Sequence, residues 1–181
     1  MTTFSTLTTR ARMRPKIAEA YASVLQELCK TEAAENLYNT TAQDLIDANA
    51  WIHAVLDSNG QLVSACTTAS RGEGNAFDLC GVVTDPRFVR KGLATRAIEE
   101  AVQSVRDRGG EWVFLVVRVW HGVVSPGPDR LYRGLGWHPT GHFCFSTITD
   151  AQKCRHLTAD YNGGYVSLEY VRELPAEREA A

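Results

Sequence analysis

Apolar residues in the first fifty positions recur at the spacing of helices. They begin after Pro15, which suits the first turn of a helix, and they predict a helix that ends near Cys29. A second, shorter helix is predicted from Thr41 to Ala50. The pattern from Met1 to Arg14 allows a short strand. The N-terminal part of the chain is therefore predicted to be mainly helical.

The apolar spacing then changes to that of strands. Trp51–Leu56 and Leu62–Thr67 flank the turn residues Asp57–Gly60, and together they predict a β-hairpin. Phe77–Val83 is the next predicted strand. Trp112–Val119 is an almost continuous apolar run, which is typical of a central strand covered on both faces.

Between these last two strands lies the most regular helix of the sequence. It is predicted to begin at Lys91 or Gly92 and to end at Arg108, before a glycine pair. A strand, a helix and a strand in this order predict a right-handed crossover with parallel strands. The fold class is therefore α/β with α+β character, a mixed sheet with helices on both faces. The remaining predicted elements are a turn, a short helix and two strands: Pro126–Pro128, a helix ending near Leu135-Gly136, Phe143–Ile148 and Tyr165–Val171.

Composition narrows the class of protein. A net charge of −2 argues against nucleic acid as the main partner, and no apolar run approaches the length of a membrane span. The N-terminus lacks the pattern of a signal peptide, and the five scattered cysteines contain no CxxC, so we expect reduced thiols in a cytoplasmic protein. Cys154 and His156 form only half of a metal site, and no metal is expected.

One stretch combines a buried strand, a basic turn and a glycine at the start of a helix. It runs from Gly81 to Thr95 and carries the basic pair Arg90-Lys91 in its turn. This arrangement aims backbone N–H groups and the positive end of a helix dipole at one point, which suits a phosphate or pyrophosphate. A nucleotide-binding protein would use the same feature, but the chain lacks the GxGxxG and GxxxxGK[ST] patterns. Gly81 itself indicates a bulge, a close backbone approach or tight helix packing.

This stretch resembles the phosphate turn of the GNAT superfamily of acyl-CoA-dependent N-acetyltransferases. The family pattern, [Gln/Arg]-x-x-Gly-x-[Gly/Ala], falls on Val89–Ala94. Both small residues match, and Val89 departs from the pattern at the first position. Arg90 or Arg87 would then replace the missing side-chain donor to the pyrophosphate.

A second segment, Leu131–Trp137, resembles the family's Leu-Tyr-x-x-x-Gly-Phe. Ser125 stands where the family often has Asn. The order of elements also agrees, so the resemblance covers about residues 50–171. It implies a GNAT-like central mixed sheet whose parallel strand–helix–strand unit binds CoA. The chain is expected to be a single acetyltransferase domain over residues 1–181, with its core at about 50–171 and a loose tail at 175–181.

The resemblance implies acetyl-CoA as cosubstrate and gives roles to individual residues. Tyr132 would protonate the departing thiolate, and Asp78 would accept the proton of the amine, with Glu73 as the alternative base. A backbone N–H near Val82 would stabilise the oxyanion. A tyrosine that only packs and a solvated strand-end carboxylate are the competing interpretations. The residues expected to hold the cofactor lie on the strand and in the turn: Val82, Val83, Thr84, Arg90, Lys91, Gly92, Leu93, Ala94 and Thr95.

The resemblance implies an N-acetyltransferase that transfers an acetyl group to a primary amine of a small molecule or peptide by direct attack. Cys80 would allow a ping-pong route, but a lone cysteine in a strand is more often a core residue. The acids Glu73, Asp78 and Asp129 suit a cationic acceptor. Residues 149–164 could form a lid over the acceptor, and a homodimer is possible. The alternative is a non-catalytic CoA-binding or protein-interaction module on the same fold, which Val89 and Ser125 favour.

Overall fold

The computed structural model describes residues 3–28, 40–72, 75–120, 123–147 and 164–175, and one eight-stranded sheet lies at its centre. The strands run in the order β1-β2-β3-β4-β5-β8-β7, and β6 pairs with β5. The strands are β1 (Ser5–Arg10), β2 (Trp51–Leu56), β3 (Leu62–Ser70), β4 (Ala76–Thr84), β5 (Trp112–Trp120), β6 (Val123–Val124), β7 (His138–Thr147) and β8 (Gly164–Glu173). The helices are α1 (Pro15–Leu28), α2 (Ala42–Asp47), α3 (Leu93–Asp107) and α4 (Pro126–Gly134).

Most predicted elements are confirmed, and the differences have local causes. The second helix ends at Asp47 instead of Ala50, and Thr41 is its N-cap in a capping box with Asp44. The predicted turn at Pro126–Pro128 is in fact the first turn of α4, since proline is compatible with that position. The strand predicted from Phe143 begins five residues earlier, at His138, as β7.

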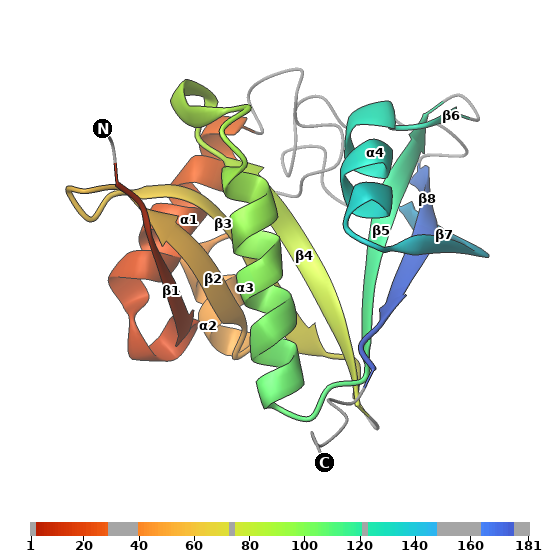
Figure 1. Cartoon of the computed structure of the whole chain (residues 1–181), viewed down its shortest axis with the longest axis horizontal. Coiled ribbons are helices and arrows are strands. Elements are labelled where there is room, and N and C mark those ends of the chain that lie inside the picture. Colours follow the sequence, from red (N-terminus) through yellow and green to blue (C-terminus); the bar gives the residue numbers. More distant parts are fainter. Residues whose placement is uncertain (1–2, 29–39, 73–74, 121–122, 148–163, 176–181) are drawn as a thin grey trace, which may run out of the picture.

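Two helical layers cover the sheet. The apolar faces of α1 and α2 pack on β2 and β3 in one core cluster, which includes Tyr21, Leu25 and Ile52. A second cluster joins α3 to β3, β4, β5 and β8 on the opposite face. Figure 1 shows α3 over the first half of the sheet and α4 over the second half, on the same side. The prediction of helices on both faces is confirmed.

Strand β5 is central, but its two faces differ. It pairs with β4 in parallel and with β8 in antiparallel orientation, as a central strand should. Val113, Leu115 and Val117 are buried on the side of α3 and α4. Val116, on the other face, is 47% exposed. The prediction that both faces of this strand are covered is therefore wrong at that position.

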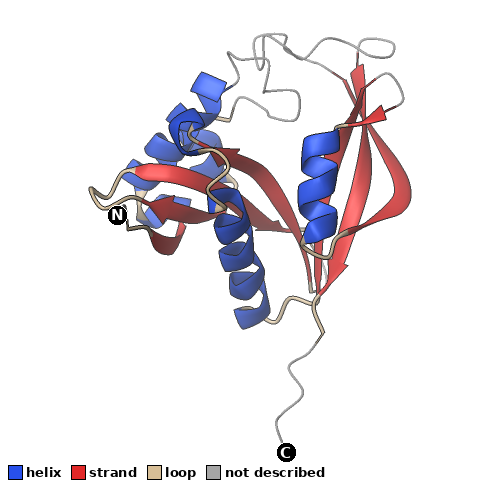
Figure 2. Cartoon of the chain, turned by 45° about the horizontal axis from the view of Figure 1, so that its top comes forward, coloured by secondary structure: helices blue, strands red, loops and turns tan. Residues whose placement is uncertain are grey.

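The parallel pairing of β4 with β5 is short. It joins three residue pairs, and the last of them is Asp78 with Phe114. Beyond this pair both strands continue, but no ladder joins their described residues, and the two halves of the sheet diverge (Figures 1 and 2). We call the diverging segments, 79–84 of β4 and 115–120 of β5, the β4–β5 split. It presents backbone edges that can pair with another extended molecule.

A chain of hydrogen bonds crosses the first half of the sheet beneath α3. Arg108 Nη2 donates to Thr68 Oγ1 at 2.9 Å, and Thr68 Oγ1 lies 2.9 Å from His53 Nε2. On the other side of the ring, Nδ1 lies 3.1 Å from Thr8 Oγ1, which donates to Glu100. Because Thr8 gives its one proton to Glu100, Nδ1 of His53 carries the ring proton. Burial, aided by the charge of Arg108, lowers the pKa of His53 to about 3.

This buried neutral histidine makes stability depend on pH. Between pH 6.5 and about 3 the unfolded chain binds a proton at His53 that the folded chain does not. The free energy of unfolding should therefore fall with falling pH in this window, by at most about 1.4 kcal/mol per pH unit from this group. His53→Asn should reduce stability at pH 7 and flatten this slope, as measured by urea unfolding from pH 4 to 7. The exposed His138→Asn is the matched control, and an unchanged slope in His53→Asn would contradict the assignment.

Candidate functional site

The turn after β4 leaves the first N–H groups of α3 uncapped. Gly92 is the N-cap residue of α3 and has φ of 73°, and no side-chain hydrogen bond caps the helix start among the described residues. Arg90 also has a positive φ of 62°. The side chains of Arg90 and Lys91 are exposed beside this end. Unpartnered N–H groups, a helix dipole and two cations give the anion site that the sequence predicts.

The turn is held from its other side by Asp85. This buried carboxylate accepts from the backbone N–H of Arg87 at 2.9 Å and from its Nη2 at 2.6 Å. These hydrogen bonds lower the pKa of Asp85, so it remains ionised. Arg87 is thus paired with a carboxylate within the turn, whereas the exposed side chain of Arg90 stands beside the start of α3.

Gly81 forms a β-bulge in the middle of β4. The register between β3 and β4 shifts between Ala65 and Thr67, and Gly81 has φ of 58°. The hydroxyl of Tyr21, on α1, donates to the Gly81 carbonyl at 2.6 Å. A Cβ at residue 81 would overlap Tyr21 Oη. Of the sequence-based explanations for this glycine, the structure therefore shows both a bulge and tight packing against a helix.

The strand residues after the bulge use their side chains within the fold. Val83 is 2% exposed and packs among residues of α1. Ser64 Oγ donates to the Val83 carbonyl at 2.7 Å and lies 2.9 Å from Thr84 Oγ1. Any ligand along Val82, Val83 and Thr84 would therefore meet mainly their backbone.

Tyr132 is placed by α4 on the opposite side of the split from Tyr21. Its ring packs edge-on against Trp137, with centroids 6.0 Å apart, and Trp137 Nε1 donates to the Val113 carbonyl at 3.2 Å. Burial raises the pKa of Tyr132 well above its usual value, with smaller contributions from Cys66 and Cys80. Tyr21 also lies within electrostatic range of Tyr132. Two protonated phenols thus approach β4 from different helices.

Helix α4 is fastened to β8 by Asp129. Its carboxylate accepts from the hydroxyl of Tyr170 and, at 2.7 Å, from Arg133 Nε. These bonds lower the pKa of Asp129, the Tyr170 contact contributing most. Asp129, which the sequence analysis listed among the acids suited to a cationic acceptor, lies in a helix, and its charge is paired with Arg133 and Tyr170. At the start of the same helix, Ser125 is 5% exposed, and its Oγ has no partner among the described residues.

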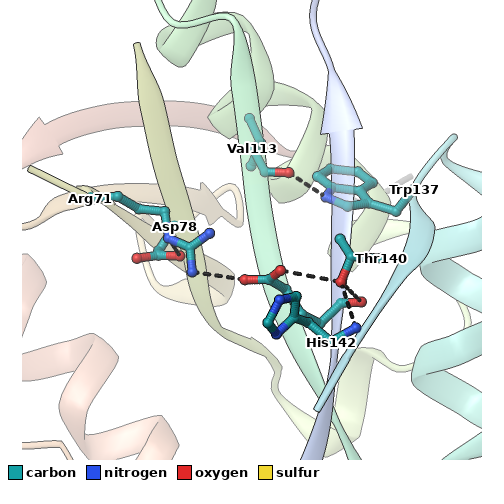
Figure 3. A network of polar contacts seen from close by, with 7 residues as sticks. Arg71, Asp78, Val113, Trp137, Thr140 and His142 are labelled. Carbon is teal, nitrogen blue, oxygen red and sulfur yellow. Dashed lines mark hydrogen bonds and ion pairs between the residues drawn. The ribbon is translucent and has the colours of Figure 1, made fainter. Parts of the chain in front are cut away.

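Asp78 lies at the last β4–β5 pair and belongs to a polar network (Figure 3). Arg71 Nε lies 3.1 Å from Asp78 Oδ1, and Arg71 Nη2 lies 2.8 Å from Glu169 Oε1. Partial burial raises the pKa of Asp78; the charge of Arg71 acts in the opposite direction, and Glu169 adds to the rise. A half-exposed carboxylate with a raised pKa is a suitable proton acceptor.

Cys80 lies two residues further along β4. The residue is exposed, so the interpretation of Cys80 as a core residue is wrong, but desolvation of the sulfur and the nearby charge of Asp78 still raise its pKa to about 11. The sulfur is therefore a thiol near neutral pH, which disfavours the ping-pong route, since a thiolate is the nucleophile.

Sequence reasoning missed three contributors to this region: Tyr21, Arg71 and Glu169. Tyr21 looks like an ordinary core position because it has helical spacing, and only the unusual Gly81 hinted at a contact. Glu73, Cys154, His156 and residues 149–163 of the predicted lid lie outside the described residues. In the part of the chain that the structure describes, no group of three His, Cys, Asp or Glu residues could hold a metal ion. Nor does any described helix have the length and apolar character needed to cross a membrane.

Comparison with known proteins identifies the family of this chain. The model of the acetyltransferase (GNAT) family matches residues 15–137, which is more than half of the chain. The chain therefore belongs to the acetyltransferase (GNAT) family. The resemblance inferred from the turn and from Leu131–Trp137 is confirmed.

Solved structures of this family share the fold at low sequence identity. The ribosomal-protein-S18-alanine N-acetyltransferase from Escherichia coli superposes with a TM-score of 0.65 at 14% identity, covering 100% of this chain and 99% of that one. An aminoglycoside 6'-N-acetyltransferase complexed with coenzyme A gives 0.67 at 14% identity, covering 93% and 98%. The ribosomal protein L11 methyltransferase of Methylobacillus flagellatus is 29% identical over 125 residues, 62% of this chain and 38% of that protein. The chain thus spans well under half the length of that relative.

The contact between Tyr21 and Gly81 can be tested by a double-mutant cycle. Gly81→Ala should cost about 1–2 kcal/mol for its positive φ, and more for the overlap with Tyr21 Oη. Tyr21→Phe should cost about 1 kcal/mol for the lost hydrogen bond. Since Phe removes the overlapping atom, the double variant should be less destabilised than the sum of the two. Additive free energies of unfolding in urea would show that the contact does not restrict residue 81.

Proposed function

We propose that this chain is an acetyl-CoA-dependent N-acetyltransferase that acetylates the primary amine of a small molecule or peptide by direct attack. The proposal rests on one observation: β4, which borders the β4–β5 split, leads through the basic turn to the uncapped start of α3. Uncapped N–H groups with Arg90 and Lys91 suit the pyrophosphate of CoA. The free strand edges of the split suit the amide groups of its pantetheine arm. The buried hydroxyl of Ser125 is one further polar group for the cofactor.

In this proposal Asp78 removes a proton from the acceptor ammonium, and the neutral amine attacks the thioester carbonyl. A backbone N–H near Val82 donates to the oxyanion. When the tetrahedral intermediate collapses, the C–S bond breaks and the thiolate needs a proton. Tyr132 is the candidate donor, and the second proton, which the attacking nitrogen loses as the amide forms, returns to the Tyr132 phenolate through water. Its raised pKa keeps Tyr132 protonated. Full transfer of its proton to a thiolate, whose thiol has a pKa of about 8.5, runs uphill by more than about 2 kcal/mol.

The acceptor in this proposal is a cationic amine. Asp78 and Glu169 lie on the face of the sheet that bears the exposed Val116, with Arg71 as the one described cation bound to both. A cationic amine would find carboxylates there. An aminoglycoside and the alanine of ribosomal protein S18 appear in the names of structural neighbours, and both offer amines, so they are sensible first acceptors to assay. We further propose that residues 1–181 form one domain and act in the cytoplasm.

The alternative, a non-catalytic CoA-binding module, shares the cofactor site and lacks turnover. Val89 and Ser125 are the departures that favour it. Asp78, a half-exposed carboxylate at the last β4–β5 pair, favours the enzyme instead, because a binding module has no need of a proton acceptor there. An enzyme would consume acetyl-CoA when an amine is present, and a binding module would not.

Acetyl-CoA should stabilise the protein. At 100 times its dissociation constant, a ligand adds about 2.7 kcal/mol, which for this size of domain is a rise in Tm of roughly 5–10 °C. ATP and NAD serve as ligand controls in the same thermal-shift assay. The double variant Arg90→Ala/Lys91→Ala should lose most of the rise, whereas the exposed Arg12→Ala should keep it. No rise with acetyl-CoA in the unsubstituted protein would contradict the proposed cofactor.

Tyr132→Phe should separate turnover from binding. Loss of a general acid should lower kcat by about 10²-fold, while the dissociation constant of acetyl-CoA changes little. The assay is the release of CoA thiol over a panel of amines, and binding is followed by calorimetry. Tyr170→Phe is the matched control for the loss of a phenolic hydroxyl, since that phenol anchors α4 and has no proposed proton to donate. Unchanged kcat in Tyr132→Phe would remove Tyr132 from the mechanism, and absence of thiol release with every amine would favour the binding module.

A further inference from the structure

One arginine joins two carboxylates across the closed end of the β4–β5 split. Arg71 follows β3 directly, and its guanidinium extends over β5, 4.2 Å from the centre of the Phe114 ring. Its Nε lies against Asp78 of β4 and its Nη2 against Glu169 of β8. In sheet order β5 separates those two strands. Arg71 therefore bridges three adjacent strands at the row where the β4–β5 pairing ends.

The bridge is continued on the far side by β7. Thr140 Oγ1 donates to Glu169 Oε2 at 3.2 Å and lies 3.3 Å from the Glu169 carbonyl oxygen. The backbone N–H of His142 in turn donates to Thr140 Oγ1 at 3.1 Å (Figure 3). Each oxygen of Glu169 is thus occupied. Glu169 is held in place, and it holds Arg71.

We propose that Arg71 and Glu169 are positioning residues for Asp78, and that together they fix its carboxylate at the closed end of the split and set its affinity for the proton of the acceptor. The inference rests on the proposed function of Asp78 as the base. Arg71 binds Oδ1, and no hydrogen bond to Oδ2 is present among the described residues. Oδ2 is therefore the atom that takes the proton from the acceptor nitrogen and later passes it to water.

The two neighbours act on Asp78 with opposite signs. The positive charge of Arg71 favours the ionised carboxylate, and the negative charge of Glu169 disfavours it. The other described titratable group facing Asp78 is Cys80 on β4, and Cys144 on β7 faces Arg71. Phe114, the residue of β5 in this row, is uncharged. Removal of each charge should therefore shift the proton affinity of Asp78 in opposite directions, and the pH profile of activity tests whether this carboxylate is the base.

The experiment compares Arg71→Gln with Glu169→Gln. Carbon-13 NMR of the side-chain carboxyls, with Asp78→Asn to assign the signal, follows the titration of Asp78 in the protein without substrate. The midpoint should rise by about one pH unit in Arg71→Gln and fall in Glu169→Gln. Arg71→Lys should restore most of the midpoint. Arg133→Gln, which removes an arginine paired with a different carboxylate, should leave it unchanged. Midpoints that do not move, or that move in the same direction in both glutamine variants, would overturn the inference.

Activity separates this inference from the function on which it rests. The acid limb of kcat/KM against pH should move with the NMR midpoint in both variants. If Asp78→Asn keeps full activity, the proposed base is wrong, and the inference that Arg71 and Glu169 position a base is overturned with it. If Asp78→Asn is inactive and the acid limb stays fixed in both glutamine variants, Asp78 keeps its role and the role of Arg71 and Glu169 is overturned alone.

Discussion

The end of the parallel pairing between β4 and β5 is the constraint on which the rest of this structure depends. Three residue pairs join the two strands, and after Asp78 and Phe114 the strands diverge. The bulge at Gly81 lies within the segment of β4 that no longer pairs with β5, and it interrupts the regular ladder of that segment with β3. Tyr21 and Tyr132 then approach β4 from different helices, and α3 begins where β4 leads into the basic turn.

Local patterns were enough to predict most of the fold. Helical spacing after Pro15, the turn at Asp57–Gly60 and the glycine before α3 each depend on residues close in sequence, and the structure confirms all three. The burial of β5 was harder, because an apolar run does not tell how many layers cover a strand. Val116 is apolar and yet 47% exposed. The two-residue strand β6 has too few positions to show any period.

The candidate site was predictable only where it uses a continuous motif. The turn at Val89–Ala94 and the segment around Tyr132 are such motifs, and the family match agrees with them. Arg71 and Glu169 are 98 residues apart and meet only because β5 and β8 pair. Asp129 shows the opposite case: its type and position suggested an acceptor site, but Tyr170, 41 residues away, uses its charge to hold a helix. Contacts of this kind depend on tertiary structure, so no local pattern reports them.

The β4–β5 split affects how firmly the two halves of the sheet are connected. Its two halves share three ladder pairs and the apolar core beneath α3, so the sheet of the free protein is unfinished along the edges of residues 79–84 and 115–120. A cofactor whose amides pair with those edges would complete the sheet much as an added strand does. In that event acetyl-CoA is a structural member of the fold as well as a reagent, and its departure after each turnover returns the two halves to a looser connection.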